Sequence, residues 1–92
     1  MTFKVVWSEA ALEQADALLE YIAQDSVSAA DNLWERLQAA TVPLAEHPNL
    51  FRPGRRPGTR ELVAHPNYIL VHRVLDGTVE IVAVLHTRQE YP

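Results

Sequence analysis

The chain contains no cysteine among its 92 residues, and this absence removes several classes of protein. Without cysteine there is no disulfide framework, no thiolate nucleophile and no cysteine-ligated zinc site. Apolar runs such as the one around residues 69–71 are far short of the ~18 residues that span a bilayer. The first residues show no signal-peptide pattern. We therefore expect a soluble protein of the reducing cytoplasm, with no membrane partner.

The length predicts a single domain, 1–92, because chains divide into several domains only well above this size. Hydrophobic residues make up 48% of the chain. A chain of this size buries roughly 60–65% of the surface that its unfolded form exposes. The core is therefore thin, and a bound partner is expected to affect stability.

Basic residues are scarce in the first half of the chain and concentrated in the second. Residues 1–50 carry two basic and eight acidic residues, whereas residues 51–92 carry six arginines and four acidic residues. Between residues 51 and 74, five arginines accompany one acid, Glu61. Such a segment is typical of binding to nucleic acid or to an acidic protein segment, and equally of a solvated basic loop. The pI of about 5.4 argues against nonspecific adhesion to nucleic acid, and direct sequence-specific nucleic-acid binding is not expected.

Hydrophobic spacing predicts an α+β fold in the order β-α-α-β-β-β, with an antiparallel sheet packed against an N-terminal helical hairpin. Ser8 is expected to cap the first helix and Ser28 to open the second, which Pro43 kinks or stops. A proline-rich loop over residues 47–58 follows. The strands are expected over 2–7, 59–65, 68–75 and 78–86, and the first helix over about 9–24.

The Asp76-Gly77 dipeptide predicts a two-residue type I′ hairpin, which fixes the register of the last two strands. Arg73 then lies opposite Glu80, with Val74 opposite Val79 and His72 opposite Ile81. The face covered by the helices is expected to show Tyr68, Leu70, His72, Val74, Val79, Ile81, Ala83 and Leu85. The other face is expected to show Ile69, Val71, Arg73, Glu80, Val82, Val84 and His86.

This second face is too apolar to meet only water, because four of its seven residues are aliphatic. Two explanations are open at this point. The N-terminal or proline-rich segment folds over the face, or a partner chain lies across it.

Metal chemistry is not indicated by the four histidines, His47, His65, His72 and His86, whose spacing does not match that of metal ligands. No metal or other cofactor is expected. Metal-free RNA cleavage needs a base, an acid and cations for the developing phosphorane charge. Arg60, Arg73 and Arg88 with His86 and Tyr91 could supply this set. Ion pairing of Arg73 with Glu80 and of Arg88 with Glu90 explains these arginines equally well.

Segments 58–63, 67–74 and 79–86 resemble the RelE/ParE superfamily of toxins from bacterial toxin-antitoxin systems. Segments 6–11, 21–23, 28–30 and 44–48 look like the ParE branch. The resemblance spans nearly the whole chain, and its ordered set of motifs is more specific than any one of them. It implies a small antiparallel sheet packed by an N-terminal helical hairpin, in agreement with the order read from the hydrophobic spacing.

The superfamily contains two activities, and the residues distinguish between them. In RelE-like members, the resemblance implies cleavage of ribosome-bound mRNA by basic residues, with Arg60 and Arg88 on matching positions. Leu62 and Ile69 replace two basic residues of that pattern, and Tyr91 is out of register with the catalytic tyrosine. An isoleucine cannot stabilise a phosphorane. If the chain were a nuclease, its catalytic candidates would be Arg60, His86 and Arg88, but the pattern favours a protein that is not an enzyme.

The resemblance therefore implies the toxin of a type II toxin-antitoxin (plasmid stabilisation) system that inhibits DNA gyrase and is neutralised by a disordered segment of a cognate antitoxin. The alternatives are a ribosome-dependent endoribonuclease and a non-toxic antitoxin-binding module. The candidate target-binding residues are Arg55, Arg56, Arg60 and Arg88. The candidate antitoxin-binding residues are Ile69, Val71, Arg73, Val82 and Val84.

Overall fold

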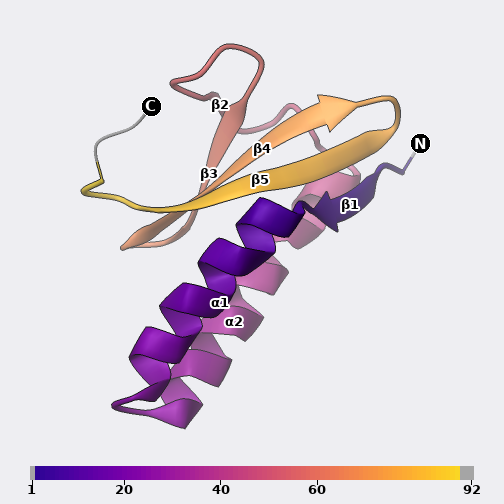
Figure 1. Ribbon diagram of the computed structural model, residues 1–92. Coiled ribbons are helices and arrows are strands. Elements are labelled where there is room, and N and C mark those ends of the chain that lie inside the picture. Colours follow the sequence, from indigo (N-terminus) through magenta and orange to yellow (C-terminus); the bar gives the residue numbers. More distant parts are fainter. Residues whose placement is uncertain (1, 90–92) are drawn as a thin grey trace.

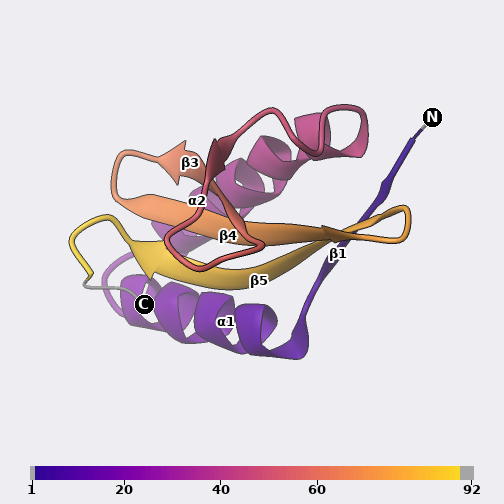
Figure 2. The same cartoon turned by 90° about the horizontal axis from the view of Figure 1, so that it is seen from above.

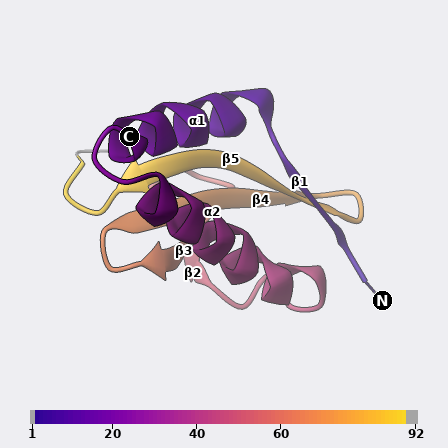
Figure 3. The same ribbon diagram turned by 90° about the horizontal axis from the view of Figure 1, so that it is seen from below.

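Two antiparallel helices form one layer of the fold and lie against one face of a sheet (Figures 1 and 3). The computed structural model describes residues 2–89. Helix α1 spans Glu9–Ala23 and begins, as predicted, at Ser8, whose Oγ accepts a hydrogen bond from Ala11 N–H at 3.0 Å. Helix α2 spans Val27–Thr41.

The start of α2 differs from the sequence prediction. Ser26, and not Ser28, caps this helix, because Ser26 has an extended backbone and its Oγ accepts from Ala29 N–H at 3.1 Å. Pro43 lies just after α2, in the first turn of the 3-10 helix η1, Val42–Ala45. A proline is tolerated there because the first turn of a helix does not use its backbone N–H groups.

The five strands lie in the order β1-β5-β4-β3-β2. Their bounds are β1 Lys4–Trp7, β2 Arg52–Pro53, β3 Arg60–His65, β4 Tyr68–Leu75 and β5 Thr78–His86. The α+β class is confirmed. The sheet is mixed rather than wholly antiparallel, because β1 runs parallel to β5, and the short β2 was not predicted.

The turn between β4 and β5 is the one that the sequence predicted. Asp76 and Gly77 both have positive φ, 42° and 77°, as a type I′ turn requires. The expected pairs of Val74 with Val79, Arg73 with Glu80 and His72 with Ile81 are all present.

Beyond Ile81 the predicted alternation is wrong, because β5 contains one extra residue. His72 pairs with Ile81, but Val71 pairs with Ala83, so Val82 is the unpaired residue of a β-bulge. Residues after a bulge change faces. Ala83 and Leu85 therefore lie on the second face, whereas Val84 and His86 lie on the helix side.

The core lies between the helices and the sheet. Leu37, Leu44, Leu70, Val79 and Ile81 have no exposed surface, and the tilted rings of Trp7 and Trp34 pack beside them with their centroids 5.1 Å apart. Within residues 2–89, neither helix has the length and apolar character that crossing a membrane requires.

Candidate functional site

The proline-rich segment folds over the sheet face that points away from the helices. We call residues 50–59 the strap; Figure 2 shows it crossing above β4 and β5. It contains β2, whose Arg52 and Pro53 pair with β3, and it closes on itself where Gly54 N–H donates to Thr59 O at 2.7 Å. The sequence left two explanations open for what covers this face. In the structure, the chain's own proline-rich segment covers it.

Glu61 on β3 holds the strap to the sheet. Its carboxylate is almost fully buried, with 2% of the side chain exposed. One oxygen accepts from Arg52 Nη2 at 3.3 Å, and the other accepts from Arg55 backbone N–H at 3.0 Å and lies 3.4 Å from Arg55 Nε. A buried carboxylate is costly unless charges and N–H groups compensate for its lost hydration. Both compensating residues come from the strap.

The predicted antitoxin-binding set does not form one open surface. Ile69 and Val71 lie on the face that the strap crosses and are 2% and 0% exposed, so they are not available to a second chain in this structure. Val84 is 9% exposed and belongs to the helix-side core because of the bulge. Arg73 and Val82 remain accessible on the second face.

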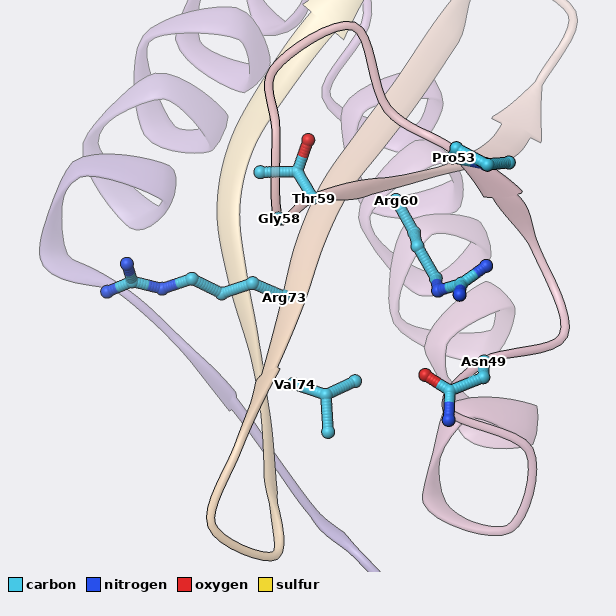
Figure 4. Close-up of a pocket in the computed structure, with 7 residues that line it drawn as sticks. All are labelled: Asn49, Pro53, Gly58, Thr59, Arg60, Arg73 and Val74. Carbon is cyan, nitrogen blue, oxygen red and sulfur yellow. The ribbon is translucent and has the colours of Figure 1, made fainter.

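Arg60 lies in a cavity of about 360 Å³ at the base of the strap, shown in Figure 4. Its Nη1 donates to Phe51 O at 2.8 Å. Arg73, on the neighbouring strand, also lines the cavity, but the two side chains point in opposite directions. The two cations therefore do not converge on one anion. The lining residues are Asn49, Pro53, Gly58, Thr59, Arg60, Arg73 and Val74.

Arg73 instead points toward the start of α1. It forms the predicted cross-strand ion pair with Glu80, at 2.8 Å. Arg73 also lines a shallow depression of about 440 Å³ with Arg56 of the strap, Ser8 and Val82. The strap thus brings one of its own arginines beside a cation of the sheet.

Arg56 and Arg73 begin a cationic surface, which Arg55 and Arg88, two other candidate target-binding residues, continue. Arg55 Nη1 donates to Gln89 O at 3.4 Å, which places Arg55 beside the turn that carries the exposed Arg88. Arg55, Arg56 and Arg88 therefore lie along the strap and the end of β5, whereas Arg60 occupies its separate cavity.

The three candidate nuclease residues are not brought together. Arg60 pairs with His72, just past the middle of β4, and His86 pairs with Tyr68 at the start of β4. Four residues of strand separate these pairs by about 13 Å. A general acid or base must lie within hydrogen-bond reach of the reacting group. His86 does lie beside Arg88, whose backbone N–H donates to His86 Nδ1 at 3.1 Å. Tyr91 and Glu90, named in the sequence hypotheses, lie outside the described residues.

His72 lies on the helix side of β4, with no exposed surface, and its ring is nearly perpendicular to that of Phe51, with the ring centroids 6.1 Å apart. Neither ring nitrogen has a hydrogen-bond partner of acceptable geometry. Burial lowers the pKa of His72, the carbonyls of Leu70 and Pro48 oppose this, and the charge of Arg60 adds to the lowering. We therefore expect a neutral imidazole in the folded chain, packed as a core residue.

This burial predicts a pH-dependent stability. In the unfolded chain His72 takes up a proton near pH 6.5, whereas the folded chain resists protonation. The free energy of unfolding should therefore fall as the pH drops below about 6.5, with His72 contributing at most about 1.4 kcal/mol per pH unit. Urea titrations between about pH 5 and 8 measure this dependence. His72→Leu should flatten it, and His47→Gln, at an exposed histidine, should not; equal slopes in all three proteins would contradict the assignment.

The remaining histidines do not assemble a metal site. The pKa of His65 is lowered by partial burial and by the charge of Arg36, and its Nδ1 accepts from Asn67 N–H at 3.0 Å. Among the residues that the structure describes, no three histidine or acidic side chains lie close enough together to hold an ion.

Sequence reasoning missed the role of Glu61, which it treated only as a stray negative charge. A signal was present, because Glu61 is the lone acid in an arginine-rich stretch and stands inside a strand pattern. An isolated acid among arginines is a candidate for a buried ion pair. Nothing local to the sequence identified Arg52 and Arg55 as its partners.

Comparison with known proteins gives consistent results. Residues 5–91 match the family model described as "ParE toxin of type II toxin-antitoxin system, parDE". The chain is 39% identical over 90 residues to "Putative toxin Y4kP" of Sinorhizobium fredii, which covers 97% of this chain and 93% of that protein. It is 40% identical over 83 residues to "Toxin RelE2" of Caulobacter vibrioides, covering 90% and 93%.

Two solved structures share the fold. The chromosomal ParDE toxin-antitoxin system from P. aeruginosa matches with a TM-score of 0.80 at 19% identity, over 92% of this chain and 96% of that one. The toxin-antitoxin complex RelBE2 from Mycobacterium tuberculosis matches with a TM-score of 0.63 at 23% identity, over 97% and 95%. At these identities the likeness establishes the fold.

Proposed function

We propose that this chain, which belongs to the ParE toxin family and is a type II toxin of the ParE/RelE superfamily, arrests growth by inhibiting DNA gyrase. The proposal follows the resemblance to ParE-like members and the residues that depart from the RelE pattern. Such a toxin acts in the cytoplasm. Its gene, carried together with an antitoxin gene, would stabilise a plasmid.

The observation that carries the proposal is the composition of the cationic surface. Arg55, Arg56 and Arg88 lie along the strap and the end of β5, whereas the one exposed histidine of the nuclease set lies about 13 Å along the sheet from Arg60. The cavity around Arg60 is lined, among the described residues, by no side chain that titrates near neutral pH. The cavity that holds Arg60 thus contains no acid or base, and His86 lies beside Arg88, away from that cavity; this separation supports binding rather than metal-free RNA cleavage.

We also propose a cognate antitoxin as the partner that neutralises the toxin. The solved structures with this fold include toxin and antitoxin together, and the cationic surface fits an acidic segment. Of the residues named from the sequence, Arg73 and Val82 are the ones still open to such a segment. The strap would have to open before Ile69 or Val71 could be contacted.

A supercoiling assay with purified gyrase tests the target. We expect the protein to inhibit supercoiling and to accumulate cleaved DNA, because a poison traps the enzyme with its DNA cut. Unchanged supercoiling together with codon-linked cuts in mRNA would replace the proposal with a RelE-type nuclease. Absence of both effects would favour a non-toxic antitoxin-binding module.

The same assay locates the target-binding surface. The double substitution Arg56→Ala and Arg88→Ala should raise the concentration needed for half inhibition by roughly tenfold or more, because two charged contacts are lost. The double substitution Lys4→Ala and Arg36→Ala is the matched control, since it also removes two positive charges, from exposed residues of β1 and α2 outside the strap. Equal loss of inhibition in both proteins would show that net charge, and not this surface, determines inhibition.

A further inference from the structure

The outer edge of β5 is only half paired. β1 pairs with β5 from Thr78 to Ile81, and beyond Ile81 no described strand lies on that side. The strand nevertheless continues to His86. Its last residues therefore present a sheet edge next to α1. An exposed edge offers backbone N–H and C=O groups that an extended chain can pair with.

Two backbone amides of this edge are capped by glutamine side chains. Val84 N–H donates to Gln14 Oε1 of α1 at 2.8 Å, and His86 N–H donates to Gln89 Oε1 at 3.3 Å. Both amides point away from β4, since Thr87 N–H, the next in sequence, donates toward β4 to Asn67 O. A glutamine carboxamide is chemically close to a peptide group. The two side chains thus occupy the places that carbonyls of a neighbouring strand would take, two residues apart.

A groove runs beside this edge and can hold side chains of an added strand as well as its backbone. It has a volume of about 320 Å³ and lies between α1 and the end of β5. Leu18 and Tyr21 of α1 and Tyr68 of β4 form its apolar walls, and Tyr21 is 72% exposed. Exposed aromatic side chains beside a groove commonly contribute much of the binding energy of an interface.

Charge indicates what kind of chain would fit. Arg55 contacts the carbonyl of Gln89 at one end of the groove, and Arg88 is exposed in the same turn. None of the described residues that line the groove is acidic. An extended segment with alternating apolar side chains and an acidic residue near Arg88 complements these features.

We propose that an extended acidic segment of the antitoxin adds to the sheet as a strand beside Val84–His86, displacing Gln14 and Gln89 from the two amides. This inference rests on the proposed antitoxin partner and specifies its binding site. The segment's carbonyls accept from Val84 and His86 N–H, and one of its apolar side chains lies between Leu18 and Tyr68. The two glutamines protect the edge while the toxin is free.

The experiment uses the whole toxin, labelled with ¹⁵N, and the polypeptide encoded by the adjoining reading frame as the probe. Amide hydrogen exchange is compared with and without this polypeptide. We expect the amides of Val84 and His86 to exchange at least about a hundredfold more slowly in the complex, because a paired strand replaces two single hydrogen bonds to side chains. Tight binding with unchanged exchange at both amides would overturn strand addition and leave the antitoxin proposal standing.

A pair of variants at one position isolates the backbone donor. His86→Pro removes the N–H that faces the groove, without removing a hydrogen bond to β4, whereas His86→Ala keeps the N–H and removes only the side chain. The proline variant should bind the probe about tenfold more weakly than the alanine variant. Gln89→Ala, which frees the same amide, should bind it at least as tightly as the wild type. Equal affinity of the proline and alanine variants would overturn the proposal.

Two other outcomes are distinguishable. A probe that does not bind the wild-type toxin would contradict the antitoxin proposal and strand addition together. Protection of Val84 and His86 that grows with toxin concentration, with no probe present, would identify a second copy of the chain as the occupant and overturn the assignment to an antitoxin.

Discussion

Replacement of Glu61 by alanine is expected to release the strap and to lower the free energy of unfolding by about 3 kcal/mol. The carboxylate accepts hydrogen bonds from Arg52 and from the backbone N–H of Arg55, and it lies 3.4 Å from Arg55 Nε. All of these contacts disappear in the variant. Urea unfolding measures the loss, and hydrogen exchange of the amides in residues 50–59 measures the opening of the strap.

The size of this effect follows from what the strap covers. Ile69, Val71 and Leu85 are almost fully buried on a face that has no helix over it. If the strap moves away, these aliphatic side chains become exposed to water, which costs about 25 cal/mol of free energy per Å² of exposed area. The two arginines left behind are already half exposed and add little cost. The loss is therefore mainly that of the ordered strap and of the apolar area beneath it.

Glu80→Ala is the matched control for Glu61→Ala. Glu80 also pairs with an arginine across strands, at 2.8 Å, but its side chain is 27% exposed and Arg73 is 48% exposed. A surface ion pair of this kind contributes less than about 1 kcal/mol. Equal destabilisation by the two substitutions would show that Glu61 does not hold the strap. The same would follow if the amides of residues 50–59 exchanged no faster in Glu61→Ala than in the wild type.

The sequence predicts the register of β4 and β5 correctly up to the bulge and wrongly beyond it. The Asp76-Gly77 turn fixes the register from Leu75 back to His72, and the structure matches it there. A register read from a turn assumes strict alternation, and Val82 breaks this assumption without any glycine or proline to announce it. Val84 and Leu85 were therefore placed on the wrong faces, although both are buried as aliphatic residues should be.

The parallel pairing of β1 was missed for a different reason. Residues 2–7 alternate as any edge strand does, and alternation does not state which neighbour a strand takes or in which direction. The partner of β1 is β5, the last strand, and the pairing depends on contacts such as Lys4 N–H to Gly77 O that join distant parts of the sequence.

The sequence predicted which charged residues belong to the candidate site, but it did not predict how they are arranged. The arginines between residues 51 and 74 identified the cationic segment, because charge is read directly from the sequence. The fold of that segment depends on Glu61, and the capping of β5 depends on Gln14, which lies 70 residues before its partner Val84. Contacts over such separations leave no local pattern.

Val71→Glu and Val82→Glu are expected to differ sharply, although the two valines were assigned to one surface from the sequence. Val71 has no exposed surface, so a glutamate there buries an unpaired charge and should lower the free energy of unfolding by more than about 4 kcal/mol. A domain of this size has little more stability than that to lose. Urea unfolding and circular dichroism should show a largely unfolded Val71→Glu protein.

Val82→Glu should keep the fold within about 1 kcal/mol, because the bulge leaves Val82 at a solvent-accessible depression beside Arg56 and Arg73. This variant alone can report on binding, and we expect it to weaken an acidic antitoxin by roughly tenfold in Kd through repulsion at that depression. Val71→Ala controls for the loss of the valine itself, and its cost should be smaller than that of the glutamate because it buries no charge. If Val71→Glu unfolded at the same urea concentration as the wild type, residue 71 would be in contact with water, and the strap could not lie over it.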